Sequence, residues 1–103
     1  MNLNGLAKLL EETGLPVTYR AWPEEGAPAL PWIAYRSPST DRLLADGGVF
    51  WCWDNVLVQL YCAFRSPETE AQVEAALSGF AWTKEETYVE SEGCYIITYE
   101  IEV

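Results

Sequence analysis

The chain of 103 residues is long enough for one hydrophobic core and too short for two, so we expect a single domain over residues 1–103. Six Lys and Arg against 16 Asp and Glu give a formal charge of −10, and no two cations are neighbours in sequence, which argues against a phosphate-gripping surface. The sequence has no apolar run of membrane-spanning length and no secretory signal at its start, so we expect no membrane contact and a cytosolic site of synthesis.

The first half of the chain predicts one helix and two short strands. Leu6, Leu9 and Leu10 form an apolar stripe that predicts a helix over residues 3–13, which Gly14 and Pro16 end. Residues 17–22 and 32–36 are β-rich, and the loop between them is too rich in Pro and Gly for a sheet interior.

Residues 37–48 predict a long connection, polar apart from Leu43, Leu44 and Ala45. Long loops in small domains are more often functional or mobile than filler. We expect this loop to be mobile in the isolated subunit and to order on assembly, with the leucines meeting another chain. A turn of helix packed on its own domain is an equally open alternative.

The central element is predicted to be a strand over residues 49–64. Alternation places Val56, Val58, Leu60, Cys62 and Phe64 on a core face. The opposite face is mixed and can meet a partner. It carries Leu57, Gln59, Tyr61 and Ala63, and Trp51 and Trp53 extend it.

The second half predicts a helix and a closing hairpin. Ser66 and Pro67 start a helix whose apolar residues recur at helical spacing, and Glu92 and Gly93 join strands at 86–91 and 95–103. The last strand alternates between a buried face and an acidic wet face. We therefore expect an α+β fold, with a mostly antiparallel sheet of four to five strands and two helices packed on one face.

No catalytic motif is present in the sequence. It has no phosphate-binding loop, no nucleophile elbow and no His, so we expect no enzyme, no catalytic residue, no cofactor and no metal. Neighbouring acids such as Glu85 and Glu86 point to different sides of an element and predict solvated charges. An odd number of cysteines, Cys52, Cys62 and Cys94, suits a reducing compartment and small buried hydrophobic residues.

The order of these segments resembles the small tail-completion or tail-terminator proteins of long-tailed bacteriophages and of prophages in Gram-positive bacteria. The resemblance rests on LPVTYRAWPEEGAPALPWIAYR, on VQLYCAF followed by SPETEAQVEAAL, and on EETYVESEGCYIITYEIEV. It covers nearly the whole chain as a layout of segments and contains no catalytic signature.

The resemblance implies a structural virion protein, assembled in the bacterial host cytoplasm, whose subunits close into a ring, usually hexameric, on the tail tube. Its partners would be the tail tube protein and the head connector, and DNA would pass without specific binding. Candidate interface residues are Leu43, Leu44, Trp51 and Trp53, and candidate lumen-lining residues are Glu85, Glu86, Glu100 and Glu102. A head-completion or neck connector protein, or a cytosolic protein-binding module, are the alternatives.

Overall fold

The structure is a computed structural model that describes residues 3–23, 26–45 and 48–103, with the side chains of residues 42–52 outside the description. The elements run in the order α1 (Leu3–Glu11), β1 (Val17–Tyr19), β2 (Trp32–Ala45), β3 (Gly48–Cys62), α2 (Pro67–Ala76), β4 (Thr83–Val89) and β5 (Cys94–Glu102). The α+β fold with a mostly antiparallel sheet is confirmed.

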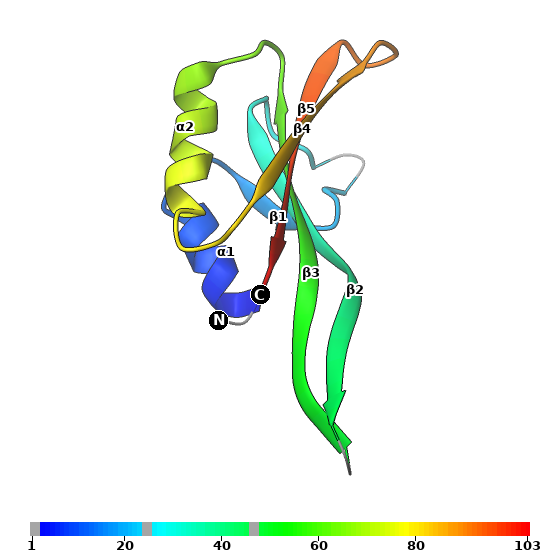
Figure 1. Cartoon of the computed structure of the whole chain (residues 1–103). Coiled ribbons are helices and arrows are strands. Elements are labelled where there is room, and N and C mark those ends of the chain that lie inside the picture. The colour runs from blue at the N-terminus through cyan, green and yellow to red at the C-terminus, as the bar shows by residue number, and fades with distance from the viewer. Residues whose placement is uncertain (1–2, 24–25, 46–47) are drawn as a thin grey trace.

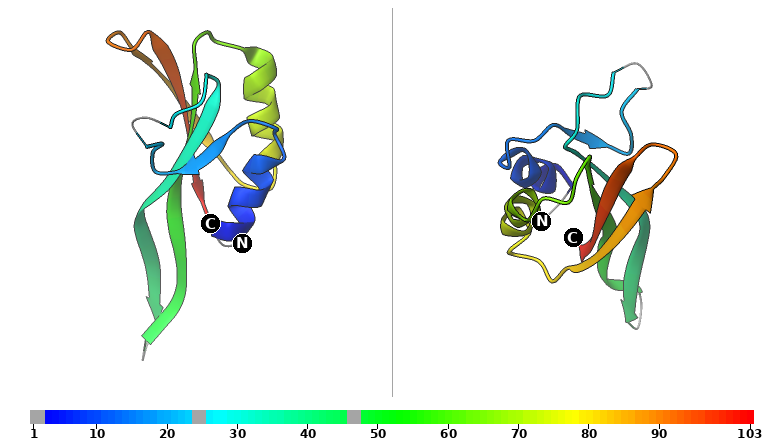
Figure 2. Two further views of the ribbon diagram at one scale, coloured as in Figure 1. Left: turned by 180° about the vertical axis from the view of Figure 1, so that it is seen from behind. Right: turned by 90° about the horizontal axis from the view of Figure 1, so that it is seen from above.

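Five strands of the described residues form one sheet in the order β1-β2-β3-β5-β4. The β1–β2 pair is parallel, and the β2–β3, β3–β5 and β4–β5 pairs are antiparallel. β3 is the third of the five strands across the sheet, which confirms that the apolar central stretch forms the middle strand. Figure 1 shows α1 and α2 next to each other on one side of the sheet, and the two views of Figure 2 agree.

Local chemistry explains where the helices begin and end. The Thr13 hydroxyl donates to the Leu10 carbonyl at 2.7 Å, and Gly14 takes the left-handed φ of 81° that ends the first helical segment. The Ser66 hydroxyl accepts a hydrogen bond from the Thr69 backbone N–H, so it caps α2 as the sequence predicts.

The core lies between the helices and one face of the sheet. Pairing aligns the alternate residues of neighbouring strands, because Leu60 stands opposite both Ile33 and Ile97. The fully buried members come from α1, β2, β3, the α2 region and β5, and they are Leu6, Leu10, Ile33, Val56, Val58, Leu60, Val73, Leu77, Ile97, Tyr99 and Ile101. The opposite face of the sheet, which carries Gln59 and Thr98, is called the open face below.

Three predictions near these elements are corrected. Residues 37–48 do not form a long connection, because β2 extends to Ala45 and β3 begins at Gly48, while residues 46–47 lie outside the described residues. Phe64 is 80% exposed, since β3 ends at Cys62 before the alternation can bury it. The first strand is shorter than residues 17–22 because Arg20 adopts a positive φ of 70°.

Candidate functional site

The β2–β3 hairpin extends beyond the rest of the sheet, and we call this extension (residues 39–45 and 48–54) the arm (Figure 1). β1 pairs with β2 only as far as Tyr35, and β5 pairs with β3 as far as Asn55, followed by two backbone hydrogen bonds between Asp54 and Val103. The molecule measures 51 × 27 × 22 Å, so it is about twice as long as it is wide. A two-stranded hairpin without a third strand is only marginally stable in water.

Side-chain hydrogen bonds reinforce the root of the arm on both faces. The Thr40 hydroxyl donates to Asp54 Oδ1 at 2.7 Å on the helix side. On the open face the Asn55 amide donates to Ser39 Oγ at 2.9 Å and to Asp41 Oδ2 at 2.7 Å. Such cross-strand polar pairs stabilise a two-stranded ladder that lacks a core of its own.

The four candidate interface residues all belong to the arm. Leu43 stands opposite Trp51, Leu44 opposite Val49, and Trp53 opposite Asp41. The side chains of Leu43, Leu44 and Trp51 lie outside the description. Trp53 is partly exposed, yet its indole nitrogen is buried and has no hydrogen-bond partner among the described residues.

The four candidate lumen acids do not all lie on the same face of the sheet. Glu100 pairs with Thr83, and Glu85 pairs with Thr98, so Glu85, Glu100 and Glu102 share the open face and are exposed. Glu86 stands opposite the core residue Ile97 and therefore lies on the helix side, where Arg65 Nη1 contacts its carboxylate at 3.0 Å. Both Glu85 and Glu86 belong to β4 and not to a loop.

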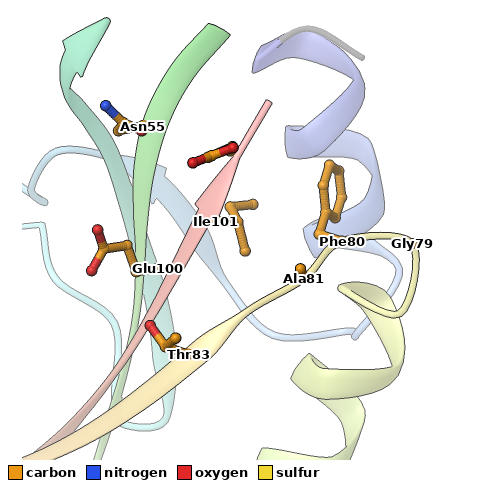
Figure 3. Close-up of a pocket in the computed structure, with 8 residues that line it drawn as sticks. Asn55, Gly79, Phe80, Ala81, Thr83, Glu100 and Ile101 are labelled. Atoms are coloured by element: carbon orange, nitrogen blue, oxygen red, sulfur yellow. The ribbon is translucent and has the colours of Figure 1, made fainter. Parts of the chain in front are cut away.

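A cleft of about 470 Å³ lies where β4 leaves the edge of β5, and we call it the notch (Figure 3). β4 begins at Thr83, opposite Glu100, so it covers none of β5 beyond that residue. Figure 3 shows Glu100 and Thr83 on one side of β5 and Ile101 and Phe80 on the other. The lining residues are Asn55, Gly79, Phe80, Ala81, Thr83, Glu100, Ile101 and Glu102.

Aromatic side chains cover the open face near β1. The rings of Trp32 and Tyr61 stack with centroids 4.2 Å apart, and Trp22 meets Trp32 edge-on at 6.1 Å. These contacts hold Trp22, in the loop after β1, against the sheet. Ala34 also belongs to the open face and is only 2% exposed. The indole nitrogen of Trp22 is buried without a hydrogen-bond partner among the described residues.

An ion-pair cluster that sequence reasoning missed joins α2 to the sheet. Glu70 is 3% exposed and accepts two hydrogen bonds from Arg65, at 2.9 and 3.0 Å, and Lys84 contacts the same carboxylate at 2.7 Å. Lys84 also contacts Glu74, which accepts a hydrogen bond from the buried Tyr99 hydroxyl at 2.8 Å.

The pKa values of this cluster follow from its contacts. The hydrogen bonds from Arg65 lower the pKa of Glu70 to about 2, although burial opposes them. Hydrogen bonding to Lys84 also holds the pKa of Glu74 below its usual value, while burial raises the pKa of Tyr99. Each charged group in the cluster has an oppositely charged partner, so the cluster has a structural role and holds α2 on the sheet.

The cysteines with described side chains show no sign of activation. Cys62 and Cys94 are free and buried, and burial raises the pKa of both thiols, which keeps them protonated at neutral pH. Among the described residues, no group of His, Cys, Asp and Glu could hold a metal ion.

Within the part of the chain that the structure describes, no helix combines the length and the apolar composition needed to cross a bilayer. Comparison with known proteins finds no matching family model and no matching characterised protein.

Proposed function

We propose that this protein is a structural component of the virion of a long-tailed phage or prophage. In this role it caps the tail tube as a ring of identical subunits, usually six, and forms the head-tail junction. It assembles in the cytoplasm of the bacterial host and performs no catalysis. The proposal rests on the segment layout described above and on the arm.

The arm is the observation that carries the proposal. Its two strands project beyond the sheet, and none of the arm residues with described side chains belongs to the buried core. Its β3 strand carries the uncharged apolar run VFWCW, residues 49–53, which is costly to leave in water. Unpaired strand edges also favour pairing with another chain. A projecting hairpin that is held together by hydrogen bonds is better suited to contact a neighbouring subunit than to act within its own chain.

The negative charge of the protein is compatible with a ring through which DNA passes. A formal charge of −10 repels phosphate, so a ring of such subunits would let DNA pass without holding it. Because Glu86 is paired with Arg65, it is a poor lumen-lining residue. Glu85 remains as an exposed acid on the open face with no ion pair among the described residues.

Light scattering and electron microscopy test the proposal. We expect rings whose mass is six times the 11.6 kDa of one chain, at high protein concentration or on purified tail tubes, and co-sedimentation with tube ends. Co-sedimentation with heads and not with tubes would instead assign the protein to the neck connectors. A protein that remains monomeric and binds neither structure contradicts a role in the junction.

A further inference from the structure

We infer that two copies of this chain pair through a two-fold contact, in which the Phe64 ring of each copy enters a hollow beside Phe64 on the other. The contact goes beyond the proposed ring and does not involve the arm. It lies at the loop between β3 and α2, at the opposite end of the molecule from the arm (Figure 1).

Phe64 is the most exposed of the large apolar side chains that the structure describes, with 80% of its surface in water. The residue just before a helix cap commonly folds back on the fourth residue of the helix. Here these positions are Arg65 and Glu70, whose side chains bond at 2.9 and 3.0 Å, so Phe64, one residue earlier, is left outside. A second chain that covers this ring recovers the free energy lost by leaving it in water.

A hollow of about 240 Å³ lies next to Phe64, between the start of β2 and the start of α2. This volume falls below the roughly 300–1,000 Å³ of small-molecule sites, so the hollow suits a single side chain. Phe64 forms one of its walls, so the protruding ring and the hollow belong to one patch. The other lining residues are Leu30, Pro31, Cys62, Ala63, Ser66 and Thr69.

The polar side chains of the hollow have partners within their own chain. The Thr69 hydroxyl donates to Ser66 Oγ at 3.1 Å, and Ser66 Oγ also accepts from the Thr69 backbone N–H. The Cys62 thiol donates to the Tyr95 carbonyl oxygen at 3.9 Å. An apolar ring can therefore enter the hollow without breaking these hydrogen bonds.

Charge favours this patch for a contact between two copies. Chains with a formal charge of −10 repel each other over most of their surfaces. The hollow has no charged residue in its described lining, whereas the notch carries Glu100 and Glu102, and the groove between the two helices carries Glu12. Two copies therefore approach with less repulsion at the hollow than at either of these clefts.

Shape selects a second copy as the occupant. A protruding ring and a hollow in one patch are complementary to themselves, so a two-fold rotation seats both rings at once. One contact then covers both Phe64 rings and fills both hollows. An aromatic ring in a desolvated pocket at the centre of a contact is the usual source of most of its binding energy.

Phe64→Ser tests the contact in the full chain. Because Phe64 is exposed, its loss should leave the fold intact, and we expect the dissociation constant of the dimer to rise at least about tenfold by sedimentation equilibrium. Ala63→Lys keeps the ring and places a charge in the hollow, so it should also weaken pairing, although it lowers the net charge that opposes pairing.

Tyr19→Ser is the matched control. Tyr19 is another exposed aromatic residue, 44% exposed on the edge strand β1 and outside the patch. This variant should pair like the original chain, and thermal melts should show that every variant is folded. A loss of pairing in Tyr19→Ser equal to that in Phe64→Ser would contradict a contact centred on Phe64.

Salt separates an apolar contact from an ionic one. Raising the salt concentration from about 50 to about 500 mM screens the repulsion between two acidic copies, so pairing should become tighter. A contact held by ion pairs would become weaker over the same range, and that result would contradict the inference.

Cross-linking shows where the ring at position 64 goes. Light and isotope-labelled chains are mixed, each with the photoreactive p-benzoylphenylalanine in place of Phe64. Cross-links should join position 64 of one copy to residues 30–31 or 66–69 of the other. Cross-links confined to single chains would show that the ring closes on its own hollow, and they would overturn the contact.

The contact is also wrong if the original chain forms no species of twice its 11.6 kDa mass, or if Phe64→Ser pairs normally. Because the contact does not involve the arm, Phe64→Ser should still form rings on tail tubes. Rings from an original chain that never pairs through Phe64 would overturn this contact alone. Chains that pair through Phe64 but bind no tail structure would instead overturn the proposed function alone.

Discussion

The alternation of side chains along β3 predicts a large difference between two neighbouring residues. Leu60 is fully buried in the core, and Gln59 lies partly exposed on the open face. Leu60→Ala should lower the free energy of unfolding by roughly 2 to 5 kcal/mol, because it removes buried methyl groups and leaves a cavity. Gln59→Ala should cost less than about 1 kcal/mol. Urea denaturation checks both values, and equal losses would contradict the assignment of the faces.

The ionised Glu70 makes the free energy of unfolding sensitive to acid. Its pKa of about 2 in the folded state lies below the usual 4.5, so the folded state gains stability above pH 4.5 and loses it as the pH falls from 4.5 to 2. Glu70→Gln should lower the free energy of unfolding at pH 7 by about 2 kcal/mol, the scale of hydrogen bonds to a charged group.

The measurement for Glu70 is chemical denaturation between pH 7 and pH 2. The difference between the original chain and Glu70→Gln should shrink across the acidic window, as the carboxylate becomes protonated in both folded and unfolded states. Glu85→Gln is the matched control, since Glu85 is exposed and forms no described ion pair. A difference that stays constant down to pH 2 would contradict the role of the Glu70 charge.

At the scale of elements, the polar root of the arm should control its local opening. Because Arg42 lies in a paired strand, trypsin should cut there slowly in the original chain. Asn55→Ala removes the hydrogen bonds to Ser39 and Asp41, so we expect cleavage at Arg42 to become several-fold faster. Gln72→Ala, at an exposed position in α2, is the control. Mass spectrometry of a cleavage time course measures the effect, and equal rates would show that the root does not hold the arm closed.

Sequence patterns identified the elements that have one buried side. The helix cap at Ser66, the central strand and the alternating last strand could all be predicted, because burial imposes a period on each of them. The arm shows no such period in its sequence, and it extends beyond the strands that flank the rest of β2 and β3. Pro38 and the Ser and Asp residues of β2 were therefore read as a loop, whereas Pro38 falls within an irregularity between Arg36 and Ser39 where strand pairing shifts.

The ion-pair cluster could have been found in part. Glu70 lies three and seven residues before Val73 and Leu77, so it belongs to the buried stripe of α2, and a carboxylate at such a position requires a cation. The partners of Glu70 cannot be identified without the fold, because Arg65 lies before α2 and Lys84 lies after it, on β4. The notch was equally inaccessible to sequence reasoning, since it depends on where β4 leaves β5.

At the scale of the whole molecule, the arm should be separable from the core. Described members of the core cluster lie outside residues 37–55, so replacing residues 39–54 by a short Asn-Gly turn should keep the fold. We expect the shortened chain to retain a cooperative thermal transition and to lose ring formation. Calorimetry and light scattering measure these properties. Unfolding of the shortened chain would show that the arm supports its own domain, and normal rings from it would contradict the arm's role in assembly.

The stacked rings of Trp32 and Tyr61, with Trp22 edge-on against Trp32, give the protein an internal optical reporter. Aromatic rings held in a fixed asymmetric arrangement produce strong near-ultraviolet circular dichroism, which disappears when the rings rotate freely. This trio lies at the β1 end of the sheet, away from the arm, so its signal reports whether the loop after β1 is seated. A sample can therefore be checked optically for an intact sheet before any failure to assemble is attributed to the arm.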